Sequence, residues 1–143
     1  MATVAPTDGT DLPLKISDTS TAVEIVNLVS NSTSRTTDTR GTTTKQSGTH
    51  KEYVATRHDM THEFEGLYTT TDDASKTSFD QLDTWRRAGT VIYWEKGTGV
   101  SGTRKESGRG IIVSLDDDAP DGDNVTFSGS IQNTGDPTIT TYA

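Results

Sequence analysis

The stretch from Gly110 to Thr141 carries the strongest strand pattern in the chain. Its second part, residues 124–132, alternates strictly between apolar and polar side chains. An alternation with a period of two predicts a β-strand with one buried face and one face in water. The apolar positions of this face are Val125, Phe127 and Ile131, with Gly129 as a gap between the last two.

The first part of the same stretch, Gly110–Leu115, is apolar on both faces. Ile111, Val113 and Leu115 share one face, and Ile112 lies on the other. This composition is typical of a strand that is covered on both sides. The connection, Asp116–Asp123, holds a proline and an Asp-Gly pair and is predicted to be a turn. The stretch is therefore predicted to form a β-hairpin with an acidic turn.

The chain has few apolar residues with which to build a core. Hydrophobic residues make up 29% of 143, and 28 threonines favour strands over helices. Chains this poor in apolar residues commonly have disordered parts or bury surface against other subunits. We expect one domain over residues 1–143, with a flexible N-terminal arm at residues 1–11.

Several other segments also have strand patterns. Arg57–Tyr68 alternates, with His58, Met60, His62 and Phe64 on one face. Residues 32–50 are too polar to bury a face and are predicted to form a long, exposed hairpin or loop, and Gly97–Gly110 is predicted to be a glycine-rich loop. The remaining strands are expected at Leu12–Ile16, Ala22–Ser30 and Thr90–Lys96, the last with Trp94 in the core.

One helix is expected, at residues 77–88. Thr77 or Ser78 can cap its N-terminus, and Gln81 stands at the capping-box distance from Ser78. Gly89 follows the last turn, where glycine ends helices. Together with the strands, this helix predicts a mainly β fold: a β-sandwich or barrel-like domain with one flanking helix.

The sequence gives no support for catalysis, a cofactor or a metal. Gly97–Gly102 has the letters of a dinucleotide fingerprint but is not followed by a helix pattern. His58 and His62 lie about 13 Å apart on a strand, too far to share an ion. The chain has no cysteine, and no apolar run is long enough to span a membrane.

Charge is unevenly distributed along the chain. The net charge of −8 argues against a general nucleic-acid binder. Residues 35–57 carry a net +3, whereas residues 110–143 hold six aspartates and no basic residue. These segments are either solvated loops or complementary surfaces on neighbouring copies of one subunit. The candidates for contacts between subunits are Arg35, Arg40, Lys45, Lys51, Asp116, Asp117 and Asp118.

An ordered set of short motifs runs along the chain from about Gly9 to Gly135. It consists of Gly9-Thr-Asp-Leu-Pro-Leu-Lys-Ile16, Lys51-Glu-Tyr53, Glu65-Gly-Leu-Tyr68, the Phe79-x-x-Leu82 helix, a hydrophobic strand, Ala119-Pro-Asp-Gly-Asp123, Val125-Thr-Phe-Ser128 and Gln132-Asn-Thr-Gly135. This set resembles the major tail (tail tube) protein family of long, flexible-tailed bacteriophages. The Asp116–Asp118 triplet and the Ser/Thr-rich segment 32–49 depart from the family pattern.

The resemblance implies a non-enzymatic β-sandwich subunit that forms hexameric rings, and the rings stack into a hollow tube in the virion tail. It also implies passage of genome DNA through the lumen without specific binding, and partners such as a tape measure and a tail terminator. In that family the loop matching Arg35–His50 and the arm matching Met1–Asp11 make contacts between rings. Assembly would take place in the host cytoplasm, with no membrane partner.

The main alternative is a protein of another class. A monomeric or cell-surface β-sandwich binding module would use loops 32–50 and 97–109 as its ligand site. Rings or tubes seen by electron microscopy would distinguish the tail protein from such a module.

Overall fold

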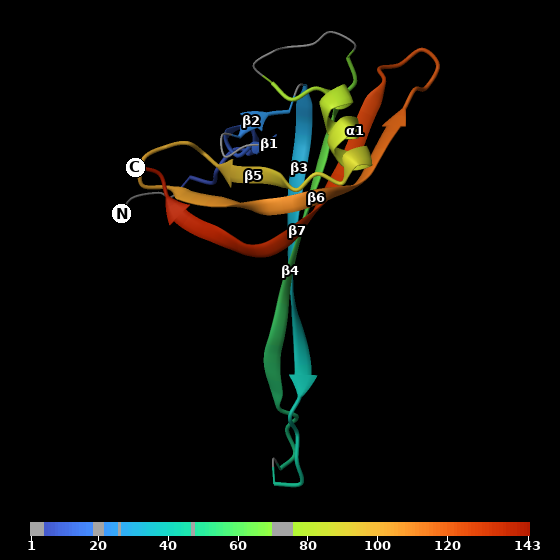
Figure 1. Ribbon diagram of the computed structural model, residues 1–143. Helices are drawn as coiled ribbons and strands as arrows, with labels where there is room; N and C mark the ends of the chain where they lie inside the picture. The colour runs from blue at the N-terminus through green and yellow to red at the C-terminus, as the bar shows by residue number, and fades with distance from the viewer. Residues whose placement is uncertain (1–4, 19–21, 26, 47, 70–75) are drawn as a thin grey trace.

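A computed structural model describes residues 5–18, 22–25, 27–46, 48–69 and 76–143. The described part forms one antiparallel sheet of seven strands in the order β2-β1-β5-β6-β7-β4-β3 (Figure 1). A 3-10 helix at Gly9–Asp11 precedes the sheet, and the helix α1 spans Phe79–Ala88. The strands are β1 Leu14–Ser17, β2 Val23–Glu24, β3 Leu28–Gly41, β4 Tyr53–Leu67, β5 Ile92–Gly97, β6 Arg104–Asp118 and β7 Thr126–Thr141.

The sheet curls strongly, so that β3 and β4 cross the direction of β5, β6 and β7 (Figure 1). Its concave side and α1 enclose a single core to which almost every element contributes. The expected mainly β, barrel-like fold with one flanking helix is confirmed. The buried hydrophobic residues are Leu14, Ile16, Ile25, Met60, Phe64, Leu82, Trp85, Ile92, Trp94, Ile112, Phe127 and Ile131.

The helix begins and ends where the sequence signals predicted. Ser78 is the N-cap, and its side chain accepts a hydrogen bond from the Gln81 amide. Gly89 closes the helix in the left-handed conformation, with φ 66°. Thr77, the other candidate cap, instead pairs with Ile25 in an isolated bridge. Leu82 and Trp85 form the buried stripe.

The C-terminal hairpin is confirmed, but its strands are longer than expected. Asp116–Asp118 belong to β6 and pair with β7 from Ser128 to Thr126, so they are not part of the turn. Arg104–Gly110 are also strand, which reduces the expected loop 97–110 to residues 98–103. Both errors have one cause: pairing with a neighbouring strand overrides weak local strand propensity.

The apolar face of β6 was assigned incorrectly from the sequence. A bulge lies between Ile112 and Ser114, so Val113 has no partner across β7. The extra residue places Leu115 on the same face as Ile112. Ile112 is buried and Leu115 packs against the core, whereas Ile111 and Val113 are exposed. Strict alternation cannot reveal such a bulge.

The N-terminal region also differs from expectation. Ala22–Ser30 is not one strand: it contains the two-residue strand β2 and the first three residues of the long strand β3, because Asn27 adopts a positive φ of 52° between them. Its carbonyl accepts a hydrogen bond from the Leu67 amide. Met1–Val4 of the expected N-terminal arm lie outside the described residues.

Candidate functional site: an acidic, hydroxyl-lined sheet face

Four strands present a polar surface on the side of the sheet opposite the core. Cross-strand partners point to the same face of a sheet. One row across β3, β4, β7 and β6 is Ser32, Glu63, Ser130 and Ser114. The next row is Ser30, Glu65, Ser128 and Asp116. We call these eight residues the polar face.

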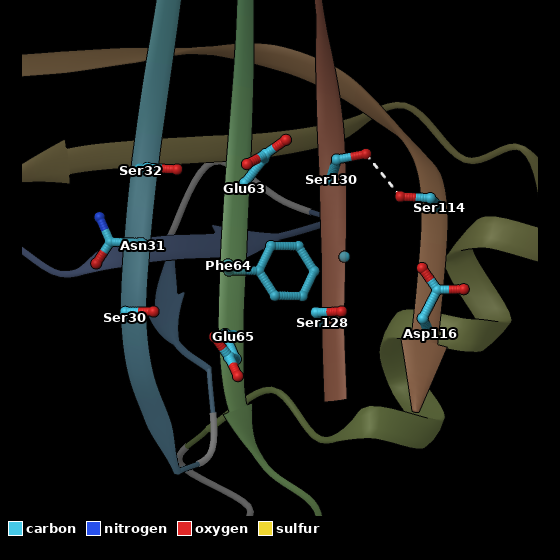
Figure 2. Close-up of a pocket in the computed structure, with 11 residues that line it drawn as sticks. Ser30, Asn31, Ser32, Glu63, Phe64, Glu65, Ser114, Asp116, Ser128 and Ser130 are labelled. Carbon is cyan, nitrogen blue, oxygen red and sulfur yellow. Dashed lines mark hydrogen bonds between the residues drawn. The ribbon is translucent and has the colours of Figure 1, made fainter. Parts of the chain in front are cut away.

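The polar face lines a shallow hollow of about 440 Å³ (Figure 2). The Ser114 and Ser130 hydroxyls lie 2.7 Å apart and share a hydrogen bond. The face holds three carboxylates and five hydroxyls, with no basic side chain. Such a surface repels phosphate groups, and nothing on it is arranged to hold them.

Close packing behind the polar face explains the glycine gap in β7. The Phe64 ring fills the space over Gly129, and a Cβ added there would lie 2.6 Å from the Phe64 Cζ atom. The gap in the apolar pattern is therefore where the Phe64 ring packs. Phe64 and Phe127 then meet edge to face, with ring centroids 6.4 Å apart.

A charged cluster lies on the core side of the sheet, away from the polar face. Glu106 is buried and accepts hydrogen bonds from Arg35 at 2.5 Å and from Arg104 at 2.7 Å. The Lys96 ammonium group donates to the Thr33 hydroxyl at 2.8 Å. The pKa of the Glu106 carboxyl is lowered, because these hydrogen bonds and the two guanidinium groups outweigh the opposing effect of its burial.

His62 lies in the core beside this cluster. Its Nδ1 atom is 2.9 Å from the Thr33 hydroxyl, and its ring centroid is 4.0 Å from that of Trp94. Burial, with the positive charges of Lys96 and Arg35, lowers the pKa of His62 to about 4. His58 is exposed, so the two histidines do not share one environment.

The structure separates the seven candidate contact residues into three places. Arg35 is exposed, and its guanidinium group is bonded to the buried Glu106. The second group, Arg40, Lys45 and Lys51, is exposed on the distal part of the β3–β4 hairpin. The third, Asp116–Asp118, is exposed at the end of β6.

Sequence reasoning missed Lys96, Arg104 and Glu106 as site residues. They lie in β5 and in the part of β6 that was expected to be loop, and strand pairing alone brings them together. The position of Glu63 and Glu65 on the exposed face could be predicted from the sequence, because they alternate with the buried residues of β4.

No group of three or more His, Asp or Glu residues in the described ranges could hold a metal ion. Within the same ranges, no helix is long and apolar enough to cross a membrane. The described residues thus form a curled β-sheet with a polar face and a projecting hairpin (Figure 1).

The family model for phage tail tube proteins matches residues 6–139, and the chain belongs to this family. Membership gives the protein a structural role in a tail tube. No curated protein matches the chain.

Solved tail structures share the fold at low sequence identity. The tail of an empty gene transfer agent particle, refined with C6 symmetry, is 16% identical with a TM-score of 0.80, over 94% of this chain and 99% of that one. The SPP1 tail tube is 14% identical with a TM-score of 0.73, over 95% and 80% of the two chains. The anti-feeding prophage baseplate is 12% identical with a TM-score of 0.63, over 99% and 98%.

Proposed function

We propose that the chain, as a single-domain subunit, assembles into hexameric rings that stack into the tube of a phage tail. The tube acts as a conduit for genome DNA during infection. The observation that carries this proposal is a four-stranded portion of the sheet with an open edge on each side. The gene transfer agent tail, which shares the fold, was refined with C6 symmetry, and this supports six copies per ring.

The first open edge is β3, the last strand in the sheet order. The second is the distal half of β6, because β5 pairs with β6 only as far as Gly110. Both edges carry exposed apolar side chains: Val29 on β3, and Ile111 and Val113 on β6. Unpaired edges of this kind invite pairing with another strand.

Strand direction allows the two edges to join. β6, β7, β4 and β3 are antiparallel in succession. The β6 edge of one copy can therefore continue the antiparallel order beside β3 of the next copy. Such a contact uses different surfaces of the two subunits, and it closes into a ring when the rotation between copies fits.

In this arrangement the polar face lines the lumen. The face lies on the side of the four-stranded portion away from the core, so six copies would surround the channel with carboxylates and hydroxyls. DNA phosphates are repelled by such a wall, which favours passage over binding.

The β3–β4 hairpin is the element suited to reach another ring. It projects far beyond the rest of the molecule (Figure 1). Arg40, Lys45 and Lys51 on its distal part are proposed to make ionic contacts with neighbouring subunits, as is the N-terminal arm within residues 1–11. Arg35 is not part of this distal group, because it lies closer to the sheet, where it bonds to Glu106 of the same subunit.

Other tail components complete the proposed assembly. A tape measure protein in the lumen and a terminator at the tube end are the expected partners, and assembly in the host cytoplasm precedes joining to the virion. We propose no enzymatic activity and no cofactor.

Electron microscopy of concentrated purified protein tests the proposal. Six-fold rings or hollow tubes are the expected result. A monodisperse monomer at high concentration, in both low and high salt, would argue against the tube function. Charge reversal of Arg40 and Lys45 should reduce stacking and leave the unfolding midpoint unchanged, because both residues are exposed.

A further inference from the structure

A cationic cleft opens beside β3 on the core side of the sheet. It has a volume of about 530 Å³ and is lined by Leu12, Arg35, Lys96, Arg104 and Glu106. We propose that this cleft receives the Asp117 carboxylate, from the acidic end of β6, of a second copy of the chain. The inference rests on the proposed ring and identifies an ionic contact that secures its subunit interface.

The cleft has more positive than negative charge. Three cations line it with one carboxylate, which leaves a net charge of +2. Both oxygens of Glu106 are already occupied, one by Arg35 and the other by Arg104. Among the described residues, Lys96 bonds to a neutral hydroxyl, that of Thr33.

The excess charge affects the groups around it. The pKa of Lys96 is lowered, first by burial and then by the positive charge of Arg35. The pKa of the neighbouring His62 is lowered for the same two reasons, with Lys96 as a further positive neighbour. An anionic group placed in the cleft relieves this repulsion.

The distal end of β6 supplies unpaired carboxylates. Asp116, Asp117 and Asp118 are exposed and make no ion pair in the described part of the chain. Asp117 pairs across the sheet with the buried Phe127, so it lies on the core side. Asp116 pairs with Ser128 and lies on the polar face instead.

The sheet places Asp117 and the cationic cleft at opposite open edges. Arg35 pairs with the buried Met60, so the cleft lies on the core side at the β3 edge. Asp117 lies on the core side at the β6 edge. When β6 of one copy lies beside β3 of the next, Asp117 and the cleft are on the same side of the joined sheet. Within one copy Asp117 is level with Leu28, seven positions along β3 from Arg35, so the contact requires adjacent copies to be offset along the strands by about 23 Å.

A double-mutant cycle on assembly tests the contact. The variants are Lys96→Gln, Asp117→Asn and the pair, and the measurement is the protein concentration at half-assembly by sedimentation. Each single change should raise that concentration about tenfold, as expected for a partly desolvated charge pair. The double variant should be no worse than either single variant.

Two comparisons make the result specific. Asp121→Asn, in the β6–β7 turn, removes the same charge outside the strand and should leave assembly unchanged. Arg40→Gln on the distal hairpin should show no coupling to Asp117→Asn. Additive effects of Lys96→Gln and Asp117→Asn, or coupling of Asp117 to Arg40 instead, would overturn the proposal.

Monomer stability provides an independent readout. Lys96→Gln keeps a donor for the Thr33 hydroxyl and removes a charge next to Arg35, so the monomer unfolding midpoint should stay the same or rise while assembly weakens. A fall in stability that accounts for the loss of assembly would contradict the contact. Failure of the wild-type protein to form rings or tubes would overturn the tube function and this contact together, whereas normal tubes from Lys96→Gln would overturn only the contact.

Discussion

At the scale of single residues, His62 makes folding sensitive to acid. A buried histidine whose pKa is about 4 must be neutral in the folded protein at pH 7. In the unfolded chain its pKa is the ordinary value near 6.5. The contribution of His62 to the free energy of unfolding is therefore at its maximum above pH 6.5. It decreases as the pH drops below 6.5 and levels off near pH 4.

We expect the free energy of unfolding to decrease by about 3 kcal/mol between pH 7 and pH 4 on account of His62 alone. Urea unfolding at a series of pH values measures this loss. His62→Gln should flatten that part of the profile. The matched control is His58→Gln, four residues away on the exposed part of β4, which should leave the profile unchanged.

Gly129 gives a second prediction at this scale. An added Cβ would lie 2.6 Å from the Phe64 ring and 2.8 Å from the Ser114 carbonyl oxygen. Because the backbone oxygen cannot move away easily, Gly129→Ala should lower the free energy of unfolding by about 1–3 kcal/mol. Gly41→Ala, in β3 with open space around it, is the control. Equal denaturation midpoints for the two variants would contradict the packing described here.

At the scale of elements, the distal β3–β4 hairpin contributes little to the fold of the subunit. Every described residue from Thr36 to Asp59 is exposed. Replacing residues 38–57 by Asn-Gly, which joins the paired residues Thr37 and His58 through a tight turn, should leave the unfolding midpoint nearly unchanged.

The same truncation should abolish ring stacking, since the hairpin is the element proposed to reach the adjacent ring. Circular dichroism measures the first effect, and electron microscopy measures the second. Long tubes formed by the truncated protein would show that the hairpin is dispensable.

Elements with complete local signals were predictable from the sequence. The helix was found from Ser78, Gln81 and Gly89, whose chemistry acts within a few residues. The burial of Phe127 and Ile131 followed from alternation in β7. The bulge at Val113 was missed because it depends on the partner strand. The cationic cleft was missed because it joins residues about 60 to 70 positions apart in sequence, which only the folded sheet brings together.

At the scale of the whole molecule, the polar face should determine whether an assembled tube binds DNA. Glu63→Lys with Glu65→Lys reverses the charge of two exposed side chains on β4 without touching the core. Tubes of this variant should retain DNA at low salt and release it as salt rises, because phosphate binding depends on ionic strength. Co-sedimentation of short duplex DNA with tubes measures the effect.

A surface control is needed for that experiment. Asp80→Lys with Gln81→Lys and Thr84→Lys makes the same net charge change at exposed positions of α1, which lies outside the four-stranded portion of the sheet, and keeps the ion pairs of Asp83. Equal DNA retention by both variants would indicate binding to the outside of the tube, and would contradict the assignment of the polar face to the lumen.

The two open strand edges have a kinetic consequence for the proposed ring. Any arc of joined copies, whatever its length, leaves one β3 edge and one β6 edge unpaired. Adding a copy therefore does not reduce the free-energy cost of these two unpaired edges. Only closure removes both edges at once. Ring formation should therefore be all-or-none, with few partial arcs at equilibrium, and closed rings should not seed new rings through their strand edges.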